Sequence, residues 1–287
     1  MSVRLQGVLP ALITPLTGAG EVDVEVLEGL LARLYAAGVD GVYVCGNTGE
    51  GMLSRVATRR TVVETAVRCS PPGKLVIAHV GAQSLDDAIT LARHASDTGA
   101  HALSSLPPGG DFDGIHNWYK SLASATSLPF LVYYFPDAVP GIRTMEEIRR
   151  LVSLPNIAGL KFTDFDLYRM SMLSRNGFTV FNGRDEVFAA GLLMGACGGI
   201  GSFYNVAPEL FLETYRLARQ GEFTEARRIQ DRINDLITIV LRFPMIPALK
   251  TMLGWRGLPC GVSLTARPLT GEETEQLRFA LEQAGFE

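Results

Sequence analysis

Short apolar segments alternate with helix-period segments along the first two hundred residues of this chain, at a spacing of roughly 30 residues. Few of the apolar segments alternate apolar with polar residues, so each predicts a strand buried on both faces, which is typical of parallel sheets. The predicted strands are residues 7–13, 41–45, 75–79, 102–105, 130–134, 157–161, 179–181 and 199–202. The predicted helices are residues 23–37, 58–68, 86–98, 144–152, 186–194, 208–219, 222–242, 246–254 and 272–284.

Eight such alternations predict an α/β fold, a (β/α)8 TIM barrel, and the helices that follow the eighth strand predict a C-terminal helical extension. We expect the barrel to occupy residues 1–206 and the extension, packed on the barrel, residues 207–287. A length of 287 residues suits one barrel with an appendage. A doubly wound sheet is the alternative, because periodicity alone does not say whether a parallel sheet closes.

Composition excludes several classes of protein. Hydrophobic residues make up 47% and charged residues 20%, which excludes disordered, collagen-like and coiled-coil chains. A net charge of −4 argues against a nucleic-acid partner. The uncharged stretch 187–208 is long enough to cross a membrane, but five glycines between Gly191 and Gly201 disfavour a helix there, so we expect no membrane partner.

The four cysteines form no C-x-x-C pair and the four histidines show no metal-ligand spacing, so no metal site is expected. Free buried thiols indicate a reducing compartment, and we expect a cytoplasmic protein.

Lys161 is the most informative candidate for chemistry, because the function of a barrel lies at the carboxyl ends of its strands. It ends a buried strand between apolar residues, where desolvation lowers the pKa of an amine. A neutral amine can attack a ketone and form a Schiff base. The alternative is a lysine that reaches the barrel rim or pairs with Asp164 or Asp166.

Tyr133 and Tyr134 end the fifth strand, and neighbouring strand residues point to opposite sides. One hydroxyl should therefore face the barrel axis, where it can relay a proton, although a packed core aromatic is the alternative.

Three loops at the same end carry further candidates. Residues 46–51, Gly-Asn-Thr-Gly-Glu-Gly, suit a backbone nest for an anion, or form an ordinary glycine-rich turn. Asp185 and Glu186 could accept hydrogen bonds from substrate hydroxyls or act as acid and base, or they simply begin a helix. The glycines of residues 198–205 let a ligand approach the backbone, or allow tight packing.

Five motifs in this order resemble the dihydrodipicolinate synthase / N-acetylneuraminate lyase family of class I aldolases, over essentially the whole chain. They are GVLPALITP (7–15), GNTGE (46–50), YYFP (133–136), GLKFT (159–163) and GIGSFYN (199–205). The resemblance implies a (β/α)8 barrel with a helical tail, a homotetramer, and a Schiff base between a lysine and pyruvate or another 2-oxo acid. It implies no metal and no organic cofactor.

The resemblance also implies roles for individual residues. Lys161 matches the Schiff-base lysine, Tyr133 the tyrosine that donates and accepts a proton, and Thr48 the hydroxyl that helps to hold the pyruvate carboxylate. The sequence looks most like the N-acetylneuraminate lyase branch. The residues that match the substrate-binding positions of this branch, or lie next to such positions in the sequence, are Asn47, Thr163, Gly183, Arg184, Asp185, Glu186, Gly201 and Ser202.

This chain departs from the family pattern at three places. Asn47 stands where the family usually has Ser or Thr, and residues 107–110, Pro-Pro-Gly-Gly, replace a loop that often carries a tyrosine of a relay across a subunit interface. Arg184 adds a cation, which favours a substrate with an anionic distal end. The arginine that the synthase branch usually carries shortly after the strand-5 tyrosine is absent from residues 137–140, and Arg143 lies further on.

We therefore expect a pyruvate-dependent lyase that acts on a small molecule, a 2-oxo sugar acid similar to N-acetylneuraminate. The alternatives are a dihydrodipicolinate synthase-type condensation, and a dehydratase or aldolase of 2-oxo-3-deoxy sugar acids. A further alternative is a non-catalytic 2-oxo acid sensor: Lys161, Tyr133 and Thr48 together speak against it, and the departures at Asn47 and residues 109–110 keep it open. A phosphate-binding barrel isomerase leaves Lys161 without a role.

Overall fold

Eight parallel strands form one sheet in the computed structural model, which describes residues 4–286. Their order in the sheet is β1-β8-β7-β6-β5-β4-β3-β2. β1 and β2 meet at a parallel bridge between Ala11 and Tyr43, where Leu12 N donates to Tyr43 O at 2.8 Å. The sheet therefore closes into a barrel, and the doubly wound alternative is wrong. The strands are β1 (Gly7–Pro10), β2 (Gly41–Val44), β3 (Leu75–His79), β4 (Ala102–Ser105), β5 (Phe130–Tyr134), β6 (Ile157–Phe162), β7 (Thr179–Asn182) and β8 (Gly198–Gly201).

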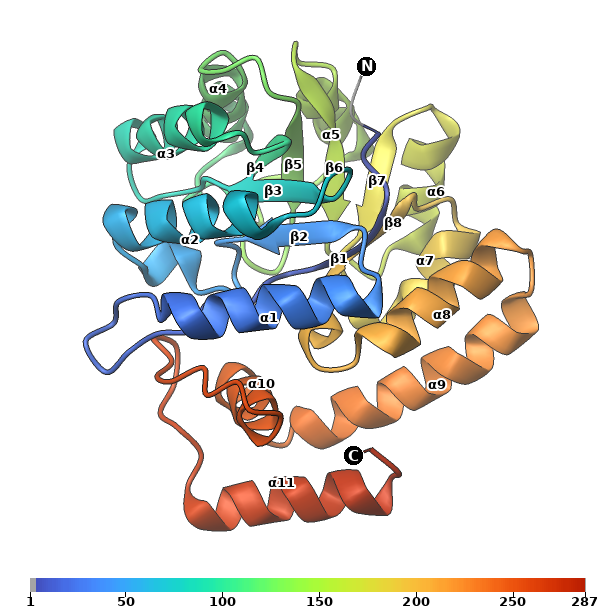
Figure 1. The fold of residues 1–287 in the computed structure, drawn as a ribbon. Helices are drawn as coiled ribbons and strands as arrows, with labels where there is room; N and C mark the ends of the chain where they lie inside the picture. The colour runs from blue at the N-terminus through green and yellow to red at the C-terminus, as the bar shows by residue number, and fades with distance from the viewer. Residues whose placement is uncertain (1–3, 287) are drawn as a thin grey trace.

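Helices follow each strand and surround the sheet (Figure 1). Asp23 caps the first of them through Val26 N at 3.2 Å, and Gly38 ends it in the left-handed conformation at φ 105°, as its position predicts. The helices around the barrel are α1 (Val24–Ala37), α2 (Val56–Cys69), α3 (Leu85–Thr98), α4 (Phe112–Ala123), α5 (Met145–Val152), α6 (Leu167–Arg175), α7 (Phe188–Leu193) and α8 (Pro208–Arg219). The helices that follow are α9 (Phe223–Val240), α10 (Met245–Trp255) and α11 (Gly271–Gln283).

The structure corrects two predicted helix starts. α2 has Arg55 at its N-cap, while the Ser54 hydroxyl donates to Glu50 O at 3.0 Å instead of capping the helix. α7 begins after a short 3-10 helix, η2 (Asp185–Val187), which occupies the predicted first turn.

α4 and α6 were not expected from the sequence. Their N-caps are Asp111, which accepts from Gly114 N at 2.9 Å, and Asp166, which accepts from Arg169 N at 2.8 Å. Both aspartates belong to D-x-D pairs, a spacing that also occurs in solvated loops. The sequence therefore did not predict that they cap helices.

Two hydrophobic cores lie on the two faces of the sheet. The larger core fills the space between the strands and the helix layer. The smaller core fills the barrel axis, and includes Leu9, Tyr43, Ile77, Leu131 and Phe181. Because both faces are apolar, a polar group at the inner face stands out as a functional candidate.

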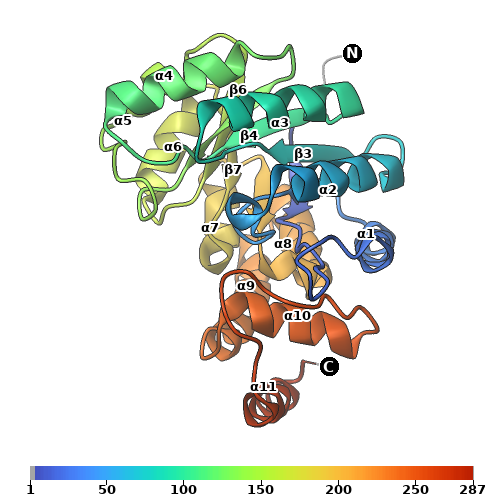
Figure 2. The ribbon, with the colours of Figure 1, turned by 90° about the vertical axis from the view of Figure 1, so that its left-hand side faces the viewer.

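Helices α9, α10 and α11 form a separate layer against one side of the barrel. α8 packs between α7 and α1 and touches β1, so it completes the helix layer of the barrel. α9 packs on α7 and α8, and α11 packs on α9 and α10. Figures 1 and 2 both show α9, α10 and α11 below α1 and α8, with α11 outermost. The division of the chain at residue 206 stays a prediction.

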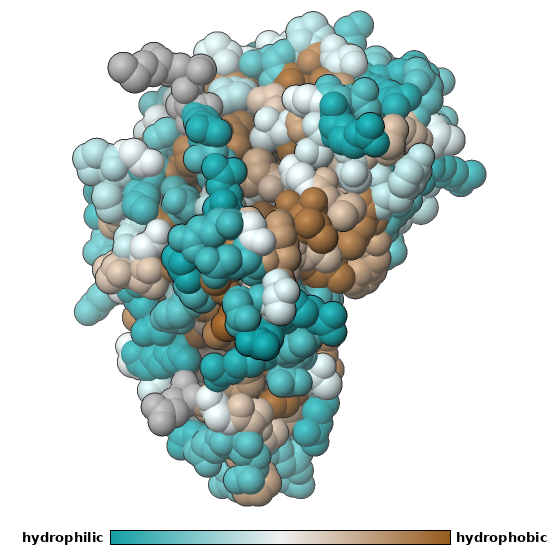
Figure 3. Space-filling view, turned by 90° about the vertical axis from the view of Figure 1, so that its right-hand side faces the viewer, coloured by the Kyte–Doolittle hydropathy of each residue, from teal (hydrophilic) through white to brown (hydrophobic). Residues whose placement is uncertain are grey.

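The outer surface is mixed in character. On the side formed by α6 to α9, Figure 3 shows polar residues over the lower lobe and apolar residues gathered in the middle of the face. No single helix among residues 4–286 has the length and hydropathy of a membrane span. α9 and α10 meet that test only as a pair, and the chain bends by 107° between them.

Candidate active site

A cavity of about 490 Å³ opens at the carboxyl ends of the strands, where a barrel is expected to place its function. Every residue predicted for the site lines it: Asn47, Thr48, Tyr133, Lys161, Thr163, Gly183, Arg184, Asp185, Glu186, Gly201 and Ser202. These residues come from the ends of β2, β5, β6, β7 and β8, so barrel closure is what brings them together. Their individual roles stay predictions.

Lys161 and Tyr133 are register partners on neighbouring parallel strands, which places both side chains on the inner face of the barrel. The Lys161 Nζ lies 4.3 Å from the centre of the Tyr133 ring and 4.5 Å from that of Tyr43. Tyr134 points outward instead, where its hydroxyl lies 3.4 Å from Asp164 Oδ2 and accepts from Arg169. The expected alternation of the two tyrosines is confirmed.

Burial sets the protonation of the Lys161 amine. Only 4% of Lys161 is exposed, and desolvation lowers its pKa to about 7, while the charge of Asp185 opposes that shift. The two aspartates considered as ion-pair partners are engaged elsewhere: Asp164 with Tyr134, and Asp166 with Arg169 at 3.4 Å. A large share of the amine is therefore neutral, and nucleophilic, near neutral pH.

Tyr133 is the second titratable group at the base of the cavity. Burial raises its pKa to about 12, against the opposing influence of Thr163 and of the Arg184 charge. The phenol therefore keeps its proton at neutral pH, so that a proton is present at the base of the cavity.

Asp185 is a buried carboxylic acid beside these groups. Its Oδ2 accepts from Phe203 N at 2.9 Å, and its Oδ1 has no hydrogen-bond partner among the described residues. Burial raises the pKa of Asp185 to about 7, a shift reinforced by the Glu186 charge. Asp185 does begin η2, as its position predicts, but its carboxylate is directed to the loop after β8, where Oδ2 binds the backbone.

Hydroxyl groups and glycines shape the remainder of the cavity. Thr48 Oγ1 and Ser202 Oγ lie 2.7 Å apart and join the loops after β2 and β8. A Cβ on Gly183 would lie 2.1 Å from Thr163 Oγ1, and a Cβ on Gly201 would lie 1.8 Å from Asp185 Oδ1. Both positions therefore require glycine, because a side chain would displace a polar group of the cavity wall.

Arg184 already has a partner within the chain. Its guanidinium pairs with the exposed Asp137 and lies over the rings of Phe165, at 4.5 Å, and Phe135, at 5.3 Å. An anionic group of a substrate would therefore have to compete with Asp137 for this cation.

The sequence did not indicate several lining residues. Phe135 could have been found, because it follows Tyr133 by two positions and shares its face; their ring centres lie 5.9 Å apart in a stacked arrangement. The end of the connection before α10, the first turn of α10 and a segment before α11 gave no signal, because nothing local marks which face of the barrel they reach. They contribute Pro244, Met245, Ile246, Pro247, Thr265 and Ala266.

Comparison with known proteins agrees with this geometry. The sequence model of the Dihydrodipicolinate synthetase family matches residues 4–284. The N-acetylneuraminate lyase of Rhizobium meliloti is 35% identical over 266 residues, which cover 91% of this chain and 89% of that protein. The N-acetylneuraminate lyase of Citrobacter koseri is 34% identical over 284 residues, covering 96% and 95%.

Among solved structures, the Ruminococcus gnavus sialic acid aldolase superposes with a TM-score of 0.92 at 29% identity, covering 98% of this chain and 97% of that one. The barrel, the buried lysine and tyrosine, and these matches along the whole chain lead to one assignment. The chain belongs to the dihydrodipicolinate synthetase family and is a class I, pyruvate-dependent aldolase.

Proposed function

We propose that this aldolase cleaves a 2-oxo sugar acid of the N-acetylneuraminate type into pyruvate and an amino-sugar aldehyde, with Lys161 as the nucleophile. The observation that carries the proposal is the buried Lys161 amine, 4.3 Å from the centre of the Tyr133 ring, in a cavity whose walls hold Asp185 and Glu186. The two relatives described above are named as N-acetylneuraminate lyases, which supports this choice of substrate.

In the proposed reaction, the neutral Lys161 amine attacks the C2 carbonyl of the substrate. Tyr133 gives its proton to the resulting hydroxyl, which leaves as water and produces a protonated imine. The Tyr133 phenolate then takes the proton of the C4 hydroxyl while the C3–C4 bond breaks, and the electrons of that bond flow into the imine. Protonation of the enamine and hydrolysis release pyruvate and return the free amine.

The other residues of the cavity bind substrate in this proposal. Thr48 and Asn47 hold the carboxylate, and hydroxyl groups of the sugar chain meet Thr163, Asp185 and Ser202. Gly183, Glu186 and Gly201 complete the part of the cavity wall around these hydroxyl-binding residues. With a pKa of about 7, Asp185 can accept or donate a hydrogen bond near neutral pH, which suits it to a hydroxyl partner.

Borohydride trapping tests the chemistry. The protein is incubated with pyruvate, reduced with borohydride, and digested for peptide mass spectrometry. We expect a reduced pyruvate adduct on Lys161, and none in a Lys161→Met variant that retains its fold by circular dichroism. A folded wild-type protein without an adduct would contradict the proposal.

Product analysis then separates the lyase from its alternatives. Incubation with N-acetylneuraminate should yield pyruvate and an amino sugar in equal amounts. Loss of water without carbon–carbon cleavage from a 2-oxo-3-deoxy acid would instead identify a dehydratase. Condensation of pyruvate with an anionic aldehyde would favour the synthase reaction, and an adduct without turnover of any substrate would identify a sensor.

The assembly and the compartment are part of the proposal too. Several large apolar side chains are more than half exposed, namely Leu53, Phe165, Tyr168, Leu193, Leu241 and Phe279, which favours a homotetramer that covers some of them. Light scattering should give four times the chain mass of 31.1 kDa. The four cysteines are free, which is consistent with a cytoplasmic location.

A further inference from the structure

Glu50, the last residue of the GNTGE motif, is a buried carboxylate that the proposed chemistry does not use. Its side chain is fully buried. Its backbone has φ 55° and ψ 28°, in the left-handed region where residues other than glycine are uncommon. Such a conformation persists when the surrounding structure holds it, and Glu50 is therefore a place to look for a function of the side chain.

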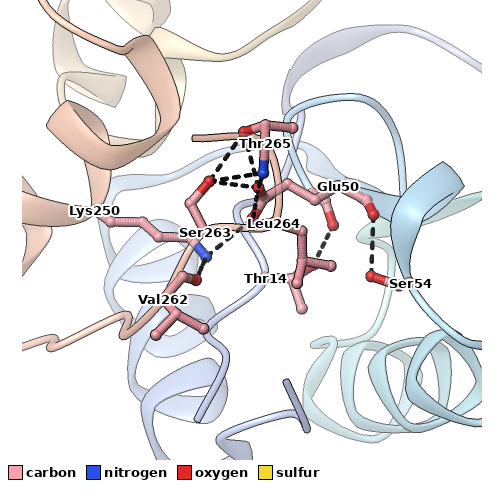
Figure 4. A network of polar contacts seen from close by, with 9 residues as sticks. Thr14, Glu50, Ser54, Lys250, Val262, Ser263, Leu264 and Thr265 are labelled. Atoms are coloured by element: carbon pink, nitrogen blue, oxygen red, sulfur yellow. Dashed lines mark hydrogen bonds and ion pairs between the residues drawn. The ribbon is translucent and has the colours of Figure 1, made fainter. Parts of the chain in front are cut away.

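The Glu50 carboxylate is bound by a segment more than 200 residues further along the chain (Figure 4). Its Oε1 accepts from Ser263 Oγ at 2.6 Å, Leu264 N at 2.7 Å, and Thr265 N and Oγ1, both at 2.9 Å. Its Oε2 lies 3.0 Å from Lys250 Nζ, which also donates to Val262 O. One carboxylate thus connects the loop that follows β2 to α10 and to the segment after α10.

The contact is a buried ion pair. The Lys250 side chain is only 3% exposed. Burial alone would raise the pKa of Glu50, but the Ser263 hydrogen bond and the Lys250 charge hold it below its usual value. Glu50 is therefore ionised, and loss of either partner would leave the other charge buried without compensation.

The two segments that Glu50 joins are both walls of the active-site cavity. Asn47 and Thr48 line the cavity from the loop after β2, and Thr265 and Ala266 line it from the C-terminal segment. Glu50 N donates to Asn47 O at 3.0 Å, so the turn that presents Thr48 includes Glu50 itself.

We propose that Glu50 is a positioning residue: with Lys250 it fixes the loop 46–50 against residues 262–266, so that the helical extension determines where the Thr48 hydroxyl lies. The inference rests on the proposed function, in which Thr48 holds the pyruvate carboxylate. Glu50 acts through Thr48 and through the cavity wall, and it touches no reacting atom.

The first test measures how borohydride trapping depends on pyruvate concentration. For Glu50→Gln we expect the half-saturating pyruvate concentration to rise roughly tenfold, while the maximal trapping rate stays within about threefold of wild type, because the loop shifts but Lys161 does not. A merely structural role would lower the melting temperature and leave the half-saturating concentration unchanged.

Asn156 provides a matched control at the other end of the barrel. It also has a positive φ, 68°, and its side-chain amide holds a loop by donating to the carbonyls of Ala123, Thr126 and Leu128. It directly precedes β6, at the strand end remote from Lys161. Asn156→Ala should lower the melting temperature without changing the pyruvate dependence.

Hydrogen exchange followed by mass spectrometry provides a readout that does not depend on pyruvate chemistry. Glu50→Gln should raise amide exchange about tenfold or more in both residues 46–51 and 262–266, and Asn156→Ala in neither. If Glu50→Gln does not fold, Ser263→Ala removes one hydrogen bond without leaving an unpaired charge. It should produce a smaller rise in the half-saturating concentration, roughly twofold to threefold.

The results separate this inference from the proposed function. Wild-type protein without a pyruvate adduct would contradict the function, and hydrogen exchange would still decide whether Glu50 couples the two segments. An adduct in wild type with unchanged pyruvate dependence in the Glu50 variant would overturn the positioning role alone. Unchanged exchange in the variant would overturn it as well.

Discussion

The Lys161 amine faces two aromatic rings, and no ion pair to a carboxylate links it to any residue in the part of the chain that the structure describes. Desolvation is therefore the main influence on the pKa of Lys161 and lowers it, while the charge of Asp185 raises that pKa by a smaller amount. The same burial raises the pKa of Asp185, so one apolar cavity floor brings an amine and an acid to similar pKa values. The pKa of Lys161 sets the lower limit of the pH range in which the proposed nucleophile works.

The pH dependence of trapping follows from these pKa values. Below pH 7 the ammonium form of Lys161 predominates and cannot attack, so the trapping rate should rise with pH and reach half its maximum near pH 7. The charge of Asp185 raises the pKa of Lys161, so Asp185→Asn should move the midpoint to lower pH. A midpoint near 10, typical of an exposed lysine, would contradict the assignment.

Gly201 gives a second prediction for a single residue. The methyl group of Gly201→Ala would lie 1.8 Å from Asp185 Oδ1, so the carboxylate must move. We expect turnover of the sugar acid to fall roughly a hundredfold, because displacements of about 1 Å in an active site carry costs of this size. Gly254→Ala is the control, because no atom beyond its chain neighbours and the backbone of its own helix lies within 4 Å of the added Cβ. Equal activity of the two variants would contradict the proposed role of the Gly201–Asp185 contact in substrate binding.

At the scale of single residues, the sequence predicted the strand-end part of the site. Lys161 stood out because a lysine in an apolar strand is unusual. Alternation along the strand predicted that either Tyr133 or Tyr134 faces the axis, and the family resemblance selected Tyr133. Pro244 and Thr265 could not be predicted, because their place depends on how the extension folds back over the barrel.

Strands were predicted more accurately than helices, and the reason is physical. Every predicted strand lies within three residues of the observed bounds, because burial on both faces of a parallel sheet gives each strand a short, nearly continuous apolar run. α4 contains a glycine and several aromatic residues, and α6 has only nine residues, so neither has a strong helical signal. The predicted start of α2 at residue 58 was two residues late, because the observed N-cap, Arg55, makes no side-chain cap and is not a residue type that marks a helix start.

The cap of α11 gives a prediction for an element. Thr270 Oγ1 accepts from Glu273 N at 3.1 Å, and Glu273 Oε2 accepts from Thr270 N at 2.8 Å, which forms a capping box. Thr270→Ala should cost about 1 kcal/mol and lower the melting temperature by roughly 2–4 °C, with unchanged turnover. Thr270→Ser keeps the hydroxyl and should melt like wild type; a loss of turnover in Thr270→Ala would show that α11 influences the site.

The whole molecule depends on contacts that cross the predicted boundary at residue 206. Phe211 of α8 is fully buried, and its ring centre lies 3.9 Å from that of Tyr204 and 5.9 Å from that of Phe188. The closed barrel was predicted from the eight strand–helix alternations, but periodicity alone left a doubly wound sheet open, and the Ala11–Tyr43 bridge decides between the two.

A fragment of residues 1–206 should therefore fail to fold. It loses α8 from the helix layer and both C-terminal walls of the cavity. Trp118 is the only tryptophan of this fragment and is 8% exposed in the full chain, so its fluorescence emission should shift to longer wavelength. Native-like emission with a cooperative melting transition would show instead that the barrel folds without its extension.

The order in which the walls of the cavity occur along the chain has a consequence for protein synthesis. Lys161 is synthesised first, and Thr265 and Ala266 follow it just over 100 residues later. Because the barrel is expected to need its extension in order to fold, the strand ends carrying Lys161 and Tyr133 should not form the cavity until that later segment has been made. The nucleophile and the C-terminal walls of its binding site should thus be completed together, and a nascent chain that stops short of Ala266 presents no finished cavity around Lys161.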